Sequence, residues 1–164
     1  MSEGTPVSEL SRSDFLKLAG LSALVPLLGG ITPASAAYGK AERLYVVTHA
    51  DDDVDRAAFA LVLASVDAKK IGKELPGLTI WFTLKGAKLC KKGEAAKLTS
   101  PVFKKFGTLA DILATSTKAG AALAACPFCL DAMNLAKSDY IKGLERKGGD
   151  YVVGQVGKAD VIWL

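Results

Sequence analysis

The chain has 164 residues and a mass of 17.1 kDa, the size of one ordinary domain, and half of its residues are hydrophobic. This composition excludes intrinsic disorder and fibrous repeats. A formal net charge of +4 and an aromatic content of 7% disfavour nucleic acid as a partner, because that requires clustered basic residues and stacking aromatics. Three cysteines are too few for a disulfide framework, and their odd number leaves at least one thiol unpaired within the chain.

Residues 1–36 have the composition of a cleaved export signal peptide. The uncharged stretch 18–39 begins with an apolar run, and Ala34 and Ala36 near its end form the small-x-small pattern of a signal-peptidase site. We therefore expect cleavage after Ala36 and a mature single domain, residues 37–164, that is periplasmic or otherwise exported.

The export route and the fate of this segment stay open. The sequence around Arg12 is similar to a twin-arginine motif, but Ser13 stands where the second arginine is expected. The uncharged stretch of 22 residues is also long enough for the alternative, a membrane anchor over residues 15–39. Because Pro26 and Pro33 disfavour a stable spanning helix, we favour cleavage and no stable membrane insertion.

The first half of the mature chain predicts a strand, a helix and a second strand. Residues 44–48 and 78–84 are uninterrupted β-branched and aromatic runs, which are typical of strands buried on both faces of a parallel sheet. Between them, residues 54–70 place apolar side chains at helical spacing after the acidic residues 51–53. This order predicts a right-handed crossover.

The second half continues the alternation. A helix is expected over residues 100–115, where Pro101 suits a first turn, and residues 121–125 predict a third buried strand. A short helix is expected over residues 130–136. The remaining predicted elements are a helical segment over 140–147 and strands over 151–153 and 161–164. The pattern indicates a three-layer α/β/α domain with a mainly parallel sheet of about five strands.

The motif Cys126-Pro127-Phe128-Cys129 carries the strongest chemical signal in the chain. A thiol at the start of a helix lies beside backbone N–H groups that stabilise the thiolate, which is the reactive form. Two cysteines at this spacing can also close a disulfide. The alternative is that both pack as small hydrophobic residues at a strand end. We interpret the pair as functional.

Cys90 and His49 are the other candidate site residues. Both follow predicted strands, so we expect them at the carboxyl edge of the sheet, near its switch point, together with Cys126. Cys90 is a candidate resolving thiol or second acceptor, or else a packing residue. His49, the only histidine, is a candidate for stabilising the Cys126 thiolate, or else a hydrogen-bonded bystander. Together with Cys126 and Cys129 they would form a Cys₃His set of zinc ligands, although the loose spacing between these residues makes the metal signal weak.

The order of elements resembles the DsrE-like sulfur-relay family (DsrE/DsrF, TusD-like). That family has a strand, an acidic alanine-rich helix, a second strand running into a basic segment, and a strand ending in cysteine. Its cysteine is followed eight residues later by Gly-Val or Gly-Ile, where this chain has Asn134-Leu135. Asparagine is the next-best residue for a left-handed helix cap. The segment 126–135 and the closing residues 160–164 are similar to the corresponding family segments.

The resemblance implies a persulfide carrier without a cofactor, and a possible sulfurtransferase activity. Cys126 would accept a sulfane sulfur and pass it to a partner protein or small thiol, and the chain would form a homo-oligomer, a trimer or larger. Cys129 is not part of the usual family pattern, so persulfide transfer and release through a disulfide both stay open. The alternatives are a non-enzymatic module that binds zinc or a small anion at this edge, and an interaction protein whose cysteines only pack.

Overall fold

The structure is a computed structural model that describes residues 42–71 and 77–164. The predicted signal peptide and its anchor alternative lie outside the described residues. The strands are β1 (Glu42–Val47), β2 (Leu78–Phe82), β3 (Ala122–Ala125), β4 (Leu144–Arg146) and β5 (Ala159–Trp163). The helices are α2 (Val54–Ile71), α3 (Leu109–Lys118), α4 (Pro127–Ala132) and α5 (Gly149–Gln155). Short 3₁₀ helices are η3 (Leu84–Cys90), η4 (Ala95–Lys97), η5 (Lys104–Phe106) and η6 (Lys137–Asp139).

The five strands form one parallel sheet in the order β4-β3-β2-β1-β5. Tyr45 in β1 pairs with Ile80 of β2 on one side and Ile162 of β5 on the other. The first two strands are almost entirely buried, which explains their unbroken apolar sequences. The predicted α/β architecture is confirmed, and every strand pairing is parallel.

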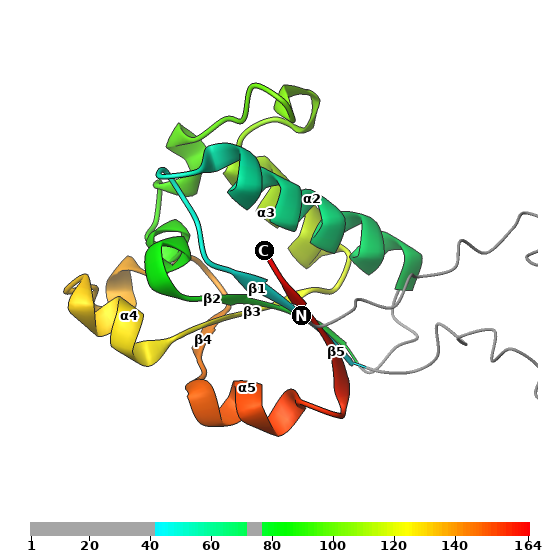
Figure 1. The fold of residues 1–164 in the computed structure, drawn as a ribbon. Helices are drawn as coiled ribbons and strands as arrows, with labels where there is room; N and C mark the ends of the chain where they lie inside the picture. Colours follow the sequence, from blue (N-terminus) through cyan, green and yellow to red (C-terminus); the bar gives the residue numbers. More distant parts are fainter. Residues whose placement is uncertain (1–41, 72–76) are drawn as a thin grey trace, which may run out of the picture. The chain divides into compact units, whose positions relative to one another are not determined.

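The sheet separates two cores of unequal size. Helices α2 and α3 cover one face and α5 covers the other (Figure 1). Alternation along β1 sends Tyr45 and Val47 into the larger core and Leu44 and Val46 into the smaller one. None of the described helices is long and apolar enough to span a membrane.

The chain crosses the sheet in one direction and then reverses. It passes from β1 through β2 and β3 to β4, after which β5 returns to the free side of β1. The switch point therefore lies between β1 and β5. The expectation that Cys126 and Cys90 lie at the switch point is wrong, because Cys126 follows β3, two strands away from β1.

The predicted helix over residues 100–115 is wrong at both ends. The Ser100 hydroxyl donates to Asp55 and accepts from the Phe103 N–H, so it stabilises a turn. Helix α3 begins later, where Thr108 forms a capping box with Asp111. This T-x-x-D pattern is a stronger start signal than Ser-Pro because it satisfies two unpaired N–H groups.

Two further predicted elements are wrong near the end of the chain. Residues 140–147 contain a glycine with positive φ, Gly143, and then the short strand β4 rather than a helix. Residues 151–153 lie within helix α5 rather than in a strand. Val152 is buried there against the second face of the sheet, which would otherwise expose Trp81. Tertiary packing thus overrides the strand propensity of Tyr-Val-Val.

Candidate functional site

Cys126 lies where β3 gives way to α4. Its backbone N–H donates to the Phe82 carbonyl at 2.9 Å, which extends the pairing of β3 with β2 by one residue. It is the N-cap residue of α4, and Pro127 occupies the first turn, a position that requires no N–H donor. The Cys126 side chain is half-buried and packs against the smaller core. The predicted strand-to-helix junction is confirmed, although α4 begins three residues earlier than predicted.

Cys129 lies in the first turn of α4, one turn after Cys126. Its sulfur accepts a hydrogen bond from the Leu84 backbone N–H at 3.1 Å and lies 3.5 Å from the Thr83 hydroxyl oxygen. Both donors come from the junction between β2 and η3. Leu84 adopts a positive φ of 49°, which is unusual for a leucine. A strained residue thus supplies one of the hydrogen bonds to the sulfur.

These contacts favour the ionised form of Cys129. Burial raises the pKa of the Cys129 thiol, but hydrogen bonds from Thr83, Cys126 and the Leu84 N–H together outweigh it, so the pKa is lowered. All three groups are uncharged donors. The cysteine pair thus has a site for negative charge on Cys129 and a neighbouring thiol that donates to it.

The far end of α4 has the left-handed cap that the sequence predicted at Asn134. Asn134 has a φ of 51°, and its N–H donates to the Asp131 carbonyl at 2.9 Å. The Leu135 N–H donates to Leu130 at 3.2 Å, which completes a Schellman motif. Leu130 is fully buried, so this cap anchors α4 and fixes the position of the cysteine pair.

Cys90 ends η3 and is fully buried in the larger core. Burial, and secondarily the charge of Cys129, strongly raise the pKa of the Cys90 thiol. All three thiols are free in the structure. The surroundings of Cys90 fit a packing residue and disfavour a nucleophile in the folded state.

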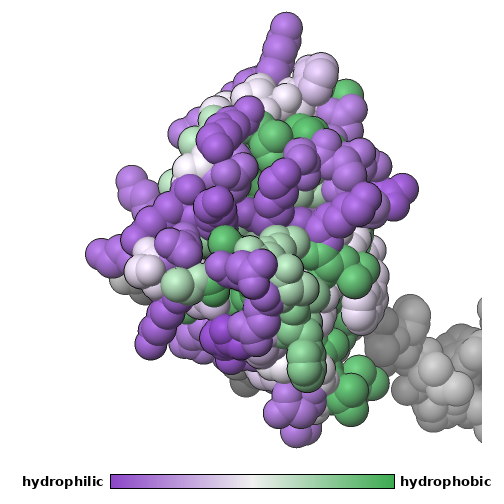
Figure 2. Space-filling model, turned by 90° about the vertical axis from the view of Figure 1, so that its left-hand side faces the viewer, coloured by the Kyte–Doolittle hydropathy of each residue, from purple (hydrophilic) through white to green (hydrophobic). Residues whose placement is uncertain are grey.

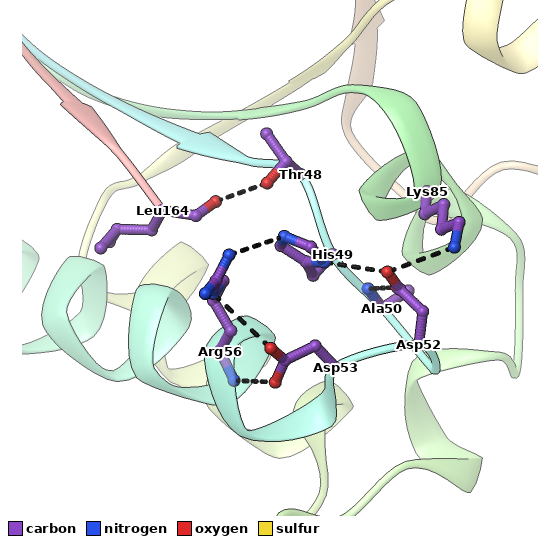
Figure 3. Close-up of polar contacts among 8 residues, drawn as sticks. All are labelled: Thr48, His49, Ala50, Asp52, Asp53, Arg56, Lys85 and Leu164. Atoms are coloured by element: carbon purple, nitrogen blue, oxygen red, sulfur yellow. Dashed lines mark hydrogen bonds and ion pairs between the residues drawn. The ribbon is translucent and has the colours of Figure 1, made fainter.

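His49 follows β1, and both of its ring nitrogens have partners other than cysteine. Nδ1 lies 2.9 Å from an Asp52 carboxylate oxygen and Nε2 lies 3.2 Å from Nη1 of Arg56 (Figure 3). Asp52 also accepts from the Ala50 N–H, and the Lys85 ammonium lies 3.6 Å from it. The contacts of His49 thus tie it to α2 rather than to the cysteine pair.

Zinc ligation by the predicted Cys₃His set finds no support in the part of the chain that the structure describes. Within residues 42–71 and 77–164, no three His, Cys, Asp or Glu side chains are grouped so that they could hold a metal ion. The buried Cys90 and the hydrogen-bonded His49 explain this result, because each is engaged elsewhere.

The surface at the carboxyl ends of the strands is mostly hydrophilic, with hydrophobic patches between the polar side chains (Figure 2). Two large apolar residues next to Cys129 are exposed: Phe128 by 80% and Leu84 by 63%. Both are too exposed to contribute much to the core. They form an exposed apolar surface beside the cysteine pair.

Solved structures similar to this chain include the YchN protein of E. coli, with a TM-score of 0.62 and 14% sequence identity over 77% of this chain and 100% of that chain. The MTH1491 protein of Methanobacterium thermoautotrophicum, described as of unknown function, matches with a TM-score of 0.50 and 13% identity, over 76% and 99% of the respective chains. The chain has a DsrE/YchN-like fold. No family model and no curated protein matches the sequence. At these identities the likeness shows the fold alone.

Within this DsrE/YchN-like fold, sequence reasoning located the cysteine pair but missed the groups that act on it. Thr83 was assigned to the second strand, and Leu84 contributes only its backbone N–H. A leucine at positive φ has no sequence signature. Arg56, the partner of His49, was also missed, although its position seven residues after His49 at a helix start was a usable signal.

Proposed function

We propose that the protein is a thiol-based sulfur carrier in which Cys126 is the sulfur acceptor and Cys129 its partner. The DsrE/YchN-like fold supports a sulfur-relay type of protein. The observation that carries the proposal is the convergence of three uncharged donors on the Cys129 sulfur beside a half-buried Cys126. Donors directed at a thiol sulfur favour its thiolate, which is the reactive form of cysteine.

The first step uses Cys129 as a proton acceptor. The Cys129 thiolate takes the proton of the Cys126 thiol, and the resulting Cys126 thiolate attacks the outer sulfur of a donor persulfide, R–S–SH. A Cys126 S–S bond forms and the donor S–S bond breaks, so RS⁻ leaves with the electron pair. The hydrogen bonds that stabilise the Cys129 thiolate also reduce its nucleophilicity, which leaves the attack on the donor to Cys126.

Two routes can discharge the persulfide on Cys126. In the first, the thiolate of a partner protein or small thiol attacks the outer sulfur and carries it away, which restores the Cys126 thiolate. In the second, Cys129 attacks the inner sulfur, the intramolecular disulfide forms and HS⁻ leaves; a dithiol reductant then resets the pair. Residues three apart on a helix are close enough for this second route after modest adjustment.

The test is intact-mass and peptide-level mass spectrometry after incubation with inorganic polysulfide. We expect Cys126→Ser to abolish sulfur addition. Cys129→Ser should load Cys126 more slowly because the proton acceptor is lost, and should then retain the persulfide because the disulfide route is lost. Cys90→Ser is the matched control and should load like the wild type. Sulfur addition that persists in Cys126→Ser would refute the role of Cys126. Release of sulfide with formation of an internal disulfide in the wild type would select the second route.

We also propose that residues 1–36 are an export signal and that the mature chain works as a homo-oligomer. The uncharged segment and the Ala34-x-Ala36 pattern support export. Cell fractionation followed by N-terminal sequencing should place a chain that begins at Ala37 outside the cytoplasm. Sedimentation of that chain should give a trimer or larger. A membrane-bound chain that retains its first residues would instead favour the anchor.

A further inference from the structure

An open hollow lies at the switch point of the sheet, between the ends of β1 and β5. It measures about 440 Å³, and Thr48, Arg56, Phe59, Trp163 and Leu164 line it. In open parallel sheets this position is where ligands bind, because the crossovers diverge there and leave a crevice outside the strand ends. We refer to this feature, with these five lining residues, as the switch-point hollow.

We propose that the switch-point hollow binds a small organic carboxylate with an apolar body, and that Arg56 is its anchoring residue. The Arg56 guanidinium is the cationic group among the lining residues. A planar guanidinium matches a carboxylate with two parallel hydrogen bonds. The proposal concerns a site separate from the cysteine pair and does not depend on sulfur chemistry.

Arg56 is held in position before any ligand arrives. Its Nη1 lies 3.2 Å from His49 Nε2, and His49 Nδ1 in turn lies 2.9 Å from an Asp52 carboxylate oxygen. Its Nε lies 3.6 Å from Asp53. Nη2 makes no hydrogen bond to another described residue. Some of the five N–H donors of the guanidinium therefore remain available to a ligand. Figure 3 shows the guanidinium between His49 and the Leu164 end of β5. A positioned donor group loses less entropy on binding a ligand.

The surrounding charges select a monoanion over a phosphate. The start of α2 is already occupied, because an Asp53 carboxylate oxygen accepts the Arg56 N–H at 2.9 Å. Asp51 and Asp52, although paired with Lys88 and Lys85, place two more carboxylates at the same helix end. A dianion would meet this repulsion without a free helix terminus to offset it. A carboxylate needs only the guanidinium.

The remaining lining favours an apolar body on the ligand. Phe59 and Trp163 are 40% and 60% exposed, so a bound molecule can remove apolar surface from water at this place. Thr48 does not compete for the carboxylate, since its N–H and its hydroxyl both donate to a backbone oxygen of Leu164. Anion recognition thus comes from Arg56, and apolar contact from the aromatic residues.

The test is a titration of the isotope-labelled full chain with phenylacetate, followed by amide chemical shifts. We expect saturable shifts at Thr48, Arg56 and Trp163, and binding about tenfold or more weaker in Arg56→Gln. Lys118→Gln, an exposed cation on α3, is the matched control and should bind like the wild type. Arg56→Lys should fall between the wild type and Arg56→Gln, because it keeps the charge but not the planar fork.

Two further probes on the unaltered protein keep the test decisive if a variant fails to fold. Neutral 2-phenylethanol and inorganic sulfate should each shift these amides about tenfold or more weakly than phenylacetate. The proposal is overturned if phenylacetate gives no saturable shift at these residues, or if Arg56→Gln binds it unchanged. Sulfate binding as strong as that of phenylacetate would also overturn it. Sulfur loading of Cys126 would be unaffected by any of these results.

Discussion

Two regions at the carboxyl edge of the sheet control charge in different ways. In the cysteine region, at the end of β3, the Cys129 sulfur receives hydrogen bonds from uncharged groups only. In the switch-point region, beside β1 and β5, carboxylates and cations pair with one another around His49. The comparison teaches that charge in the cysteine region depends on local hydrogen-bond geometry, while charge in the switch-point region depends on ion pairs and therefore on ionic strength.

The 3₁₀ helix η3 connects the two regions. The Leu84 N–H donates to Cys129, Lys85 lies 3.6 Å from Asp52, and the Gly86 N–H donates to the Thr48 carbonyl at 3.0 Å. Three consecutive residues thus contact the thiol, the charged cluster and the end of β1. A change in this turn affects both regions, whereas changes elsewhere affect one of them.

Gly86→Ala should disturb the cysteine region and the switch-point region together, and it has the largest expected effect on stability. A Cβ at residue 86 would lie 2.2 Å from the Val47 carbonyl oxygen and 2.8 Å from its carbon, so η3 must move away from β1. We expect a loss of about 3 kcal/mol in the free energy of unfolding by urea. Gly154→Ala, where the added Cβ meets nothing within 4 Å, is the control. Equal stability of both variants would show that η3 is free to shift.

Thr83→Val should weaken the cysteine region alone. It removes one of the donors that lower the pKa of Cys129, so the pKa rises and less thiolate is present at neutral pH. Loss of this partly buried hydrogen bond should cost roughly 1 kcal/mol in the free energy of unfolding. Alkylation of Cys129, followed peptide by peptide across pH, should show a profile displaced to higher pH. Thr115→Val, at an exposed hydroxyl on α3, should leave the profile unchanged.

The same donors make stability depend on pH through the Cys129 thiol. Because the folded pKa of Cys129 is lowered from 9.0, its contribution is complete above pH 9 and is lost as pH falls through the folded value. The stability difference between the wild type and Cys129→Ser should therefore grow as pH rises toward 9. A difference that stays constant with pH would mean that the thiolate is not stabilised by folding.

Asp52→Asn should alter the switch-point region alone, through its acid sensitivity. Hydrogen bonds from the Ala50 N–H, and then from His49, lower the pKa of the Asp52 carboxyl below its ordinary 3.8. A lowered carboxyl pKa contributes stability above about pH 4 that is lost as pH falls through the folded value. Acid unfolding of Asp52→Asn should accordingly show a shallower loss below pH 4 than the wild type. Asp150→Asn is the control. If its acid-unfolding curve were equally shallow, the loss of stability below pH 4 could not be attributed to Asp52.

The elements predicted correctly are those whose own residues form a clear hydrophobic pattern. The elements missed are those whose conformation depends on packing against other parts of the chain. Strands β1 and β2 are unbroken apolar runs, and the Cys126 junction follows from Pro127 at a helix start. Helix α5 was misjudged because its Tyr-Val-Val run has strand propensity, and only the exposed second face of the sheet makes it a helix. The Leu84 N–H could not be found at all, since a backbone donor is aimed by φ and not by residue type.

Asn134→Gly and Asn134→Ala give the smallest effects and test how far the position of α4 matters to the cysteine region. Asn134 has a φ of 51°, which glycine adopts freely and alanine does not. We expect Asn134→Gly to gain roughly 0.5 kcal/mol and Asn134→Ala to lose about 1 kcal/mol in the free energy of unfolding. Because the Schellman cap anchors α4, the alanine variant should also raise the pKa of Cys129, seen as slower alkylation at neutral pH. Unchanged alkylation with reduced stability would mean that Thr83 and Leu84 hold Cys129 without help from the cap.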